Sequence, residues 1–247
     1  MTAATMLVTG CWPRSAVTAT WTASTLALSA DDDAVIADRW AQRQAAAAGI
    51  SLFDGPMGRL ETWQAEATTL RLTLSRTSFR VWLGTNVDHP DHARARRADP
   101  LGVSTLVRSV DGFFLLGVRS PRVALYPGGV HPFGGGVEST TGEPDPMGDA
   151  LRELHEEAGV TAADLGAVTC LGIGVDPLLA QPELLILAEC HLDAATIAAR
   201  VDADEHSAPW QIAAAEVPAA LHRETRLTPI GRCILQRSFE FRVSSFE

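Results

Sequence analysis

The order of the secondary-structure elements expected along this chain predicts an α/β or α+β fold with a mixed sheet. Segments with the period-two alternation typical of strands are interleaved with helical segments over the 247 residues, and such mixed orders are typical of these two fold classes. The composition agrees, because hydrophobic residues make up 46% and charged residues 20% of the chain, a balance that allows a sizeable core.

The chain is expected to divide near the Asp99-Pro100 pair, which follows a polar stretch at 88–97 with the composition of a surface loop. Residues 1–100 would then form a smaller N-terminal α+β domain, and residues 101–247 the main domain. In the first part, apolar residues alternate with Thr and Ser over 17–24, which predicts a strand.

A helix and another strand are expected in the rest of this first part. The acidic run at 31–33 can cap a helix that runs to about Ala48 and ends at Gly49. Leucines alternate with polar residues over 70–75, which predicts a half-buried strand.

The main domain is expected to begin with a hairpin, whose strands lie at 103–107 and 113–118 and whose tight turn is Asp111-Gly112. A loop rich in proline and glycine follows at 121–136. The remaining expected elements are a helix ending at Ala158, strands at 168–175 and 184–192, and a C-terminal helix beginning near Thr228-Pro229.

Lysine is absent from the chain, since Lys plus Arg is 20 and all 20 are arginine. This excludes chemistries that need an ε-amine, such as the Walker-A phosphate site, the protein-kinase lysine and Schiff-base catalysis. The formal net charge of −10 argues against a nucleic-acid polymer as the partner. We therefore expect a small-molecule partner.

The four cysteines form no C-x-x-C pair, so we expect reduced thiols in the core of a cytoplasmic protein. No stretch of the sequence reaches the roughly 18 apolar residues of a membrane span, and no membrane partner is expected. The segment from Leu178 to Cys190 comes nearest, but Gln181, Pro182 and Glu183 interrupt it.

The helix that precedes Gly159 is expected to carry four carboxylates on one face. Asp145 fits its N-cap, and Gly159 fits the left-handed position that ends it. At about 100° per residue, one arc of the helix collects the carboxylates of Asp149, Glu153, Glu156 and Glu157. Such a face is either an ordinary solvated surface or a set of hard oxygen ligands for Mg²⁺ or Mn²⁺.

The segment from Arg152 to Val160 resembles half of a known enzyme signature. It reads Arg-Glu-Leu-His-Glu-Glu-Ala-Gly-Val and matches the R-E-U-x-E-E-x-G-U half of the Nudix box at every fixed position, U being an aliphatic residue. Just upstream lies Phe133-Gly-Gly-Gly-Val-Glu138, where glycines let the backbone approach a ligand and offer carbonyl oxygens to a cation. The resemblance implies a Nudix α/β/α sandwich with a mixed sheet.

The loop half of the box departs from the family pattern. The stretches from Gly136 to Glu143 and from Glu143 to Arg152 are each one residue longer than in the Nudix box. The longer loop leaves open whether Glu143 or Glu138 contributes to the site, whereas the helix half is complete.

Beyond the box, much of the chain is similar to the UDP-glucose pyrophosphatase subfamily known from mammals, which also carries an N-terminal domain. The similar segments occur in the subfamily's order at 52–56, 59–60, 77–79, 83–86, 98–103, 119–120, 171–174 and 188–192. This similarity implies metal-dependent hydrolysis of UDP-glucose or UDP-galactose to UMP and a sugar 1-phosphate.

The resemblance also implies which residues carry the chemistry. Glu153, Glu156 and Glu157, with the carbonyl of Gly136, are expected to bind Mg²⁺ or Mn²⁺ and so to activate water for attack on phosphorus. Either Glu153 or Glu157 is the candidate general base, and Arg152 is expected to orient a glutamate.

Three residues outside the helix are candidates for substrate binding. Arg119 is either a phosphate contact or a plain surface arginine. Thr85 and Asn86 are candidate hydrogen-bond partners of a nucleoside or sugar, although a turn is the commoner use of Gly-Thr-Asn.

Two alternative functions stay open at this point. The chain could be a Nudix hydrolase of another nucleotide, such as ADP-ribose, or a Nudix fold that binds a nucleotide without turnover. The complete set of box glutamates argues against the second alternative. Replacing Glu156 or Glu157 by Gln is expected to leave the fold intact, since both side chains are placed away from the core.

Overall fold

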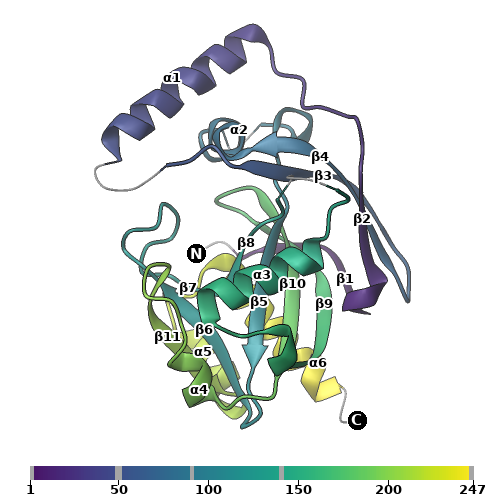
Figure 1. Cartoon of the computed structure of the whole chain (residues 1–247), viewed down its shortest axis with the longest axis vertical. Helices are drawn as coiled ribbons and strands as arrows, with labels where there is room; N and C mark the ends of the chain where they lie inside the picture. The colour runs from purple at the N-terminus through teal and green to yellow at the C-terminus, as the bar shows by residue number, and fades with distance from the viewer. Residues whose placement is uncertain (1–2, 48–51, 90–91, 139–141, 245–247) are drawn as a thin grey trace.

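The computed structural model describes residues 3–47, 52–89, 92–138 and 142–244. Its strands form a large sheet of eight strands and a small sheet of three, and helices cover both faces of the large sheet (Figure 1). The mixed α/β architecture expected from the sequence is confirmed. Within the described ranges, no helix is long and apolar enough to cross a membrane.

The large sheet has the order β1-β9-β10-β5-β6-β11, with β7 paired to β6 and β8 paired to β5. Its strands are β1 (Thr5–Pro13), β5 (Gly102–Arg108), β6 (Phe113–Arg119), β7 (Val130–His131), β8 (Phe133–Gly136), β9 (Leu165–Asp176), β10 (Gln181–Cys190) and β11 (His206–Ala213). The pair β5 and β10 is parallel, and the other pairs are antiparallel.

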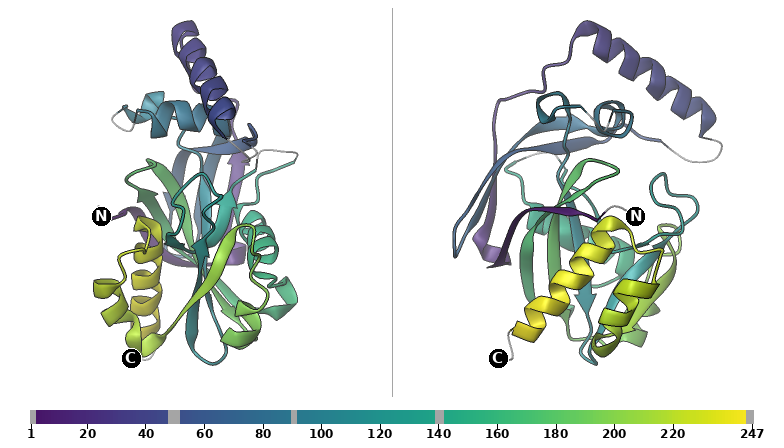
Figure 2. Two further views of the ribbon diagram at one scale, coloured as in Figure 1. Left: turned by 90° about the vertical axis from the view of Figure 1, so that its left-hand side faces the viewer. Right: turned by 180° about the vertical axis from the view of Figure 1, so that it is seen from behind.

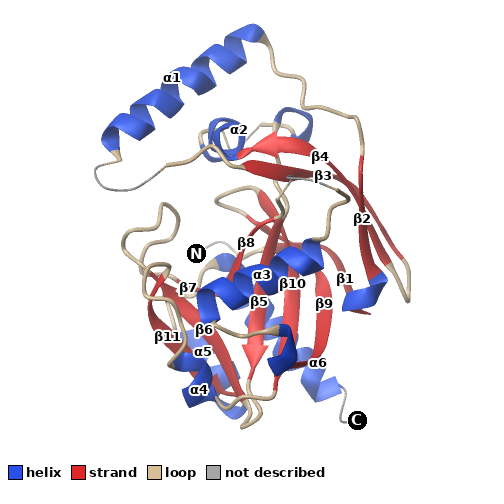
Figure 3. Ribbon diagram, viewed as in Figure 1, coloured by secondary structure: helices blue, strands red, loops and turns tan. Residues whose placement is uncertain are grey.

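The small sheet has the order β2-β4-β3 and lies with α1 at one end of the molecule (Figure 3). Its strands are β2 (Val17–Trp21), β3 (Pro56–Ala65) and β4 (Leu70–Ser78). The helices are α1 (Ala30–Ala46), α2 (Phe79–Trp82), α3 (Pro146–Ala158), α4 (Ala194–Ala198), α5 (Val217–Arg223) and α6 (Pro229–Ser244). Since β1 pairs with β9, the first hundred residues also supply a strand to the large sheet, and the division near residue 100 stays a proposal.

Neighbouring residues of the central strands face opposite layers of helices. Leu106 of β5 packs in one core with Ile230 and Ile234 of α6, whereas Val107 packs in another with Leu154 of α3. Because successive side chains of a strand point to opposite faces, α3 and α6 must lie on opposite sides of the large sheet. The two views of Figure 2 show this arrangement.

A third core joins the small sheet to the large one. Leu72 and Leu74 of β4 are buried in the same cluster as Val103 of β5 and Leu184 of β10. Met147 at the start of α3 belongs to this cluster too. The start of α3 is therefore held by apolar contacts with the first hundred residues as well as with the large sheet.

A buried polar contact reinforces this join. Asn86, in the short π-helical segment Leu83–Val87 that follows α2, is fully buried. Its Oδ1 accepts the N–H of Ala98 at 2.9 Å, and its Nδ2 donates to the Asp99 carboxylate at 2.9 Å and to the carbonyl of Ala180 at 3.0 Å. One side chain thus links three segments that are distant in the sequence.

Several elements agree with the sequence-based predictions, and two need correction. The β5–β6 hairpin turns at Gly112, whose φ of 88° suits glycine. The N-cap of α1 is Ser29, not the acidic run, because Ser29 forms a capping box with Asp32; Gly49 lies outside the described residues. The expected loop at 121–136 contains β7 and β8, since pairing with β5 and β6 imposes strand geometry on a glycine-rich segment that lacks alternation.

The cysteines are all free, but they are not all in the core. Cys170 and Cys190 are buried, whereas Cys11 is exposed and Cys233 is partly exposed. Cys11 lies on β1 at the edge of the large sheet, where alternate side chains face outward. The prediction of four core thiols is therefore wrong for Cys11.

Replacing Asn86 by Leu should lower the free energy of unfolding by at least about 2 kcal/mol. The leucine keeps the volume but removes the buried hydrogen bonds from Asn86 to the Asp99 carboxylate and to the carbonyl of Ala180. Urea unfolding measures this loss. Gln42→Leu, on the exposed face of α1, is the matched control, and an equal loss in both variants would contradict the linking role of Asn86.

Candidate functional site

The helix α3 has the caps that its sequence predicts. The Asp145 side chain accepts the N–H of Gly148 at 2.9 Å, and Gly159 ends the helix with a φ of 60°. Leu154 and Ala158 are fully buried against the large sheet. These contacts fix the rotation of the helix and therefore the direction of its glutamates.

The glycine-rich strand β8 lies beside α3 and receives two of these glutamates. The N–H of Gly134 donates to Oε2 of Glu157 at 2.7 Å. A Cβ atom at position 135 would lie 2.5 Å from Oε1 of Glu153, so the glycine there makes room for that carboxylate. The two carboxylates thus approach the backbone of one short strand.

Glu157 is buried, which corrects the expectation that it faces away from the core. Its residue is 5% exposed, and Nε2 of the fully buried His206 lies 3.3 Å from its Oε2. Helix periodicity gives the direction of Glu157 from the axis of α3, but β8 and β11 cover that direction. His206 was not anticipated from the sequence, which carries no motif around it.

Glu153 is an acid in an unfavourable environment. Burial raises the pKa of its carboxyl to about 7, with the negative charges of Glu157 and Glu156 adding to the rise and Arg152 opposing it. A second positive charge at this position would favour the ionised form. Glu156 is different, because its side chain is 55% exposed.

Arg152 contacts several acids at once, as expected for a residue that orients a glutamate. Its guanidinium lies 3.0 Å from Glu153, 3.0 Å from Glu156 and 3.1 Å from Glu138. It also lies 3.6 Å from Asp149. The single positive charge of Arg152 therefore compensates four carboxylates only in part, which leaves a surplus of negative charge along this face of α3.

The glutamates line a cavity of about 490 Å³ that we name the acidic pocket. Its lining residues are Arg119, Gly134, Gly135, Glu153, Glu156, Glu157, Asp202, Asp204 and Glu205. The last three acids come from the segment before β11 and were not singled out in the sequence. Their signal was a run of acids about forty residues after the box, and only the fold brings it opposite α3.

The acidic pocket has the donors that Mg²⁺ and Mn²⁺ prefer, which are carboxylate and carbonyl oxygens. The environment of Glu153 also indicates a cation site, because this acid is buried among other acids and shares one arginine with them as counter-charge. Among the described residues, however, no three His, Cys, Asp or Glu side chains already converge on one metal position. The residues fit a divalent cation chemically, and binding would require side-chain rotation.

Arg119 lies where the acidic pocket meets a second cavity. It lines both, and its Nε donates to the carbonyl of Leu125 at 2.9 Å. Gly134 and Gly135 also belong to both cavities. Of the three predicted substrate-binding residues, Arg119 is thus the one that the fold brings beside the glutamates.

Thr85 and Asn86 are not brought together with the glutamates. Both side chains are buried, and neither residue lines the acidic pocket. The Thr85 hydroxyl accepts the Ala98 N–H at 2.9 Å and donates to the carbonyl of Val81 at 2.8 Å. Their hydrogen-bonding groups are occupied within the protein, because they join α2 to the segment before β5.

The two loop carboxylates of the box differ in their contacts with the α3 acids. Glu143 is exposed, whereas Glu138 contacts Arg152 and its N–H donates to Asp149 at 3.3 Å. Gly136 lines the second cavity and not the acidic pocket. Of the two loop carboxylates, Glu138 is thus the one connected to the α3 acids.

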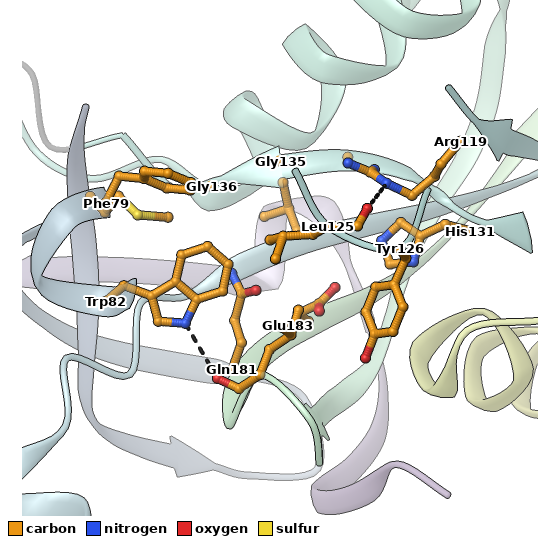
Figure 4. A pocket seen from close by; sticks show the side chains of 14 residues that line it. Phe79, Trp82, Arg119, Leu125, Tyr126, His131, Gly135, Gly136, Gln181 and Glu183 are labelled. Carbon is orange, nitrogen blue, oxygen red and sulfur yellow. Dashed lines mark hydrogen bonds between the residues drawn. The ribbon is translucent and has the colours of Figure 1, made fainter. Parts of the chain in front are cut away.

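The second cavity has a volume of about 220 Å³, and we name it the aromatic pocket. Figure 4 shows Phe79 and Trp82 at one end, Arg119, His131 and Tyr126 at the other, and Gln181 and Glu183 between them. Met57, Val103, Leu125, Leu179 and the glycines of β8 complete its lining. The sequence contained a signal for this pocket, since Gln181 and Glu183 interrupt an apolar strand.

Glu183 is a buried acid whose carboxyl has a raised pKa. Burial raises the pKa of its carboxyl to about 8, and the charge of Asp176 adds to the rise. The hydrogen bond from Ser104, at 2.5 Å, and the charge of Arg119 oppose it. Tyr126 faces the same acids, and its hydroxyl donates to Asp176 at 2.8 Å.

Comparisons with known proteins found similar chains among the solved structures. No family model and no curated protein matches the sequence. Among solved structures, a Deinococcus radiodurans protein is similar at 19% identity and a TM-score of 0.47, over 74% of this chain and 98% of that one. A MutT protein of Methanosarcina mazei is similar at 21% identity and a TM-score of 0.40, over 57% and 93% of the two chains. A mutT/nudix family protein of Listeria innocua is similar at 18% identity and a TM-score of 0.44, over 59% and 95%.

Replacing Gly135 by Ala should reduce the turnover number for the expected hydrolysis of a UDP-sugar about a hundredfold, with little change in the melting temperature of the protein. The new Cβ displaces the Glu153 carboxylate, which is the end of a flexible side chain, and the backbone need not move. Gly174→Ala is the control, since a Cβ there meets only ordinary contacts at 3.4 Å or more. Equal kcat values for the two variants would exclude a role for the position of Glu153.

Glu183 should make stability depend on pH between about 4.5 and about 8. The unfolded chain releases this proton near the ordinary value of 4.5, whereas the folded chain keeps it up to about 8. The raised pKa in the folded state means that the contribution of Glu183 is fully present below pH 4.5 and is lost as the pH rises through 8. Urea unfolding of the wild type and of Glu183→Gln should therefore diverge over this range, and parallel pH profiles would contradict the assignment.

Proposed function

We propose that this protein is a metal-dependent Nudix hydrolase that cleaves the diphosphate of a nucleoside diphosphate derivative, with UDP-glucose or UDP-galactose as the substrate. One observation carries the proposal. The glutamates of the Nudix-like segment Arg152–Val160 line the acidic pocket, which also contains the arginine expected to contact phosphate. The general course of the chain supports the hydrolase, and the segments shared with UDP-glucose pyrophosphatases support the sugar nucleotide.

The residues of the pocket have distinct tasks in this proposal. Glu153, Glu156 and Glu157 would hold Mg²⁺ or Mn²⁺, whereas Gly136, expected from the sequence to add its carbonyl, lines the aromatic pocket instead. When bound, such an ion neutralises charge on the diphosphate and lowers the pKa of water. Arg152 restrains Glu153 and Glu156, because its guanidinium nitrogens lie 3.0 Å from a carboxylate oxygen of each.

The chain also prepares the site without any ion. The Gly134 N–H restrains the Glu157 carboxylate, and Nε2 of His206 lies 3.3 Å from it, so the side-chain rotation that cation binding requires would fall mainly on Glu153 and Glu156. Arg119 supplies positive charge at the junction of the two cavities, where it can contact a phosphate oxygen. The carboxylates of Asp202, Asp204 and Glu205 also line the acidic pocket. Their negative charge repels a diphosphate that is not bound to a cation.

Purified protein with Mg²⁺ should convert UDP-glucose to UMP and glucose 1-phosphate, and EDTA should stop the reaction. Product analysis on UDP-glucose, UDP-galactose and ADP-ribose tests this directly. Faster hydrolysis of ADP-ribose would overturn the substrate and keep the hydrolase. Binding of all three without turnover would indicate the non-catalytic alternative, and turnover unaffected by EDTA would contradict the metal.

Glu157→Gln should lower kcat at least about a hundredfold. The fold should persist, because the amide oxygen can still accept the Gly134 N–H that Glu157 now accepts. Glu240→Gln on α6, whose carboxylate is about half exposed, is the control for loss of one acid. Equal kcat values in both variants would remove Glu157 from the site.

A further inference from the structure

The aromatic pocket adjoins the acidic pocket, and its lining is mainly apolar where that of the acidic pocket is charged. The two cavities share Arg119, Gly134 and Gly135. At about 220 Å³, the aromatic pocket is smaller than the roughly 300–1,000 Å³ of cavities that enclose a whole drug-sized ligand. It therefore suits one part of a molecule whose charged part lies in the acidic pocket.

The walls of the aromatic pocket are apolar and aromatic. Phe79 and Trp82 lie edge to face, with ring centroids 5.5 Å apart, and Met57, Leu125 and Leu179 add aliphatic surface. A flat ring gains most from such walls, because it buries two apolar faces against them. A hexose carries a hydroxyl on almost every carbon and would lose hydrogen bonds to water on entering.

Most of the polar groups around the pocket are already occupied. The Trp82 Nε1–H donates to the carbonyl of Leu179 at 3.3 Å, and the Tyr126 hydroxyl donates to Asp176. Gln181 differs, because its residue is 8% exposed and its amide makes no hydrogen bond with any described residue. Glu183 is 5% exposed and has one hydrogen bond, from Ser104.

The side chains of Gln181 and Glu183 define the edge that a ligand must present. The carboxamide of Gln181 offers one donor and one acceptor, and a neutral Glu183 carboxyl offers a further donor. Together they form a donor, an acceptor and a second donor. The complementary edge has acceptor, donor and acceptor, as in the O4, N3–H and O2 atoms of uracil. A charged group of the ligand is disfavoured beside Gln181 and Glu183, since both side chains are buried and uncharged.

We propose that the aromatic pocket binds the nucleobase of the substrate, with a uracil-type edge paired to Gln181 and Glu183 and its ring against Phe79 and Trp82. This inference rests on the proposed function for the position of the diphosphate beyond Arg119. The inference goes further by stating which nucleobase the site selects and which residues select it.

Ligand-observed saturation-transfer NMR tests the proposal without turnover. UMP, CMP and glucose 1-phosphate are each mixed with the full chain in the presence of EDTA. The H5 and H6 protons of UMP should receive the strongest saturation, because the base would be enclosed by the aromatic walls. CMP should bind about tenfold more weakly, since its amino group replaces the O4 acceptor.

Gln181→Met keeps the length of the side chain and removes its amide. The affinity for UMP should fall about tenfold, and the discrimination between UMP and CMP should shrink. Gln211→Met, at an exposed position of β11, is the matched control and should bind UMP like the wild type. Equal UMP affinity in Gln181→Met and in the control would overturn the pairing.

The outcomes separate this inference from the proposed function. Saturation of the sugar protons of glucose 1-phosphate without binding of UMP would overturn the base assignment, even if UDP-glucose is hydrolysed. UMP binding that depends on Gln181 in a protein without diphosphatase activity would uphold the pocket and defeat the proposed function. Turnover of UDP-glucose, UDP-galactose and ADP-ribose at equal rates would overturn the specificity for uracil.

Discussion

The hydrogen bond from Gly134 to Glu157 is the contact on which the candidate site depends. It ties the short strand β8 to the helix α3, and pairing with β5 fixes β8 in the large sheet. Because glycine carries no side chain, the backbone of β8 can approach two carboxylates on one side. The same glycines line the aromatic pocket. The strand therefore works as a thin partition between a charged cavity and an apolar one.

Two buried acids, Glu153 and Glu183, lie on the two sides of β8, and their negative charge is avoided or compensated in different ways. Burial raises the pKa of both carboxyls, to about 7 for Glu153 and about 8 for Glu183. Glu153 lies among other acids and shares Arg152 with them, so a further cation would stabilise its charge. Glu183 has apolar surroundings and Asp176 nearby, so it keeps its proton. The first environment attracts a divalent ion, and the second favours an uncharged ligand.

The sequence predicts the elements that depend on local signals and misses those that depend on distant contacts. The caps at Asp145 and Gly159, the hairpin turn at Gly112 and the mixed order of strands and helices are all local. The strand β8 has no such signal, since its conformation comes from pairing with β5. For the same reason periodicity placed Glu157 on a polar face, although β11 covers it through His206. Asp202, Asp204 and Glu205 line the same cavity as the α3 glutamates because of the tertiary fold, since about forty residues separate the two segments in the sequence.

The candidate site needs the first hundred residues, whether or not they form a domain. Met57, Phe79 and Trp82 build one end of the aromatic pocket, while Arg119 and the glycines of β8 come from the rest of the chain. Asn86 follows Trp82 closely and bonds both to Asp99 and to Ala180, which precedes Gln181. The buried amide therefore fixes the distance between the aromatic wall and the polar pair of β10. An insertion or loss in this region would change the lining of the aromatic pocket without touching the glutamates of α3, so under the proposed function the choice of base could change while the hydrolytic residues stay in place.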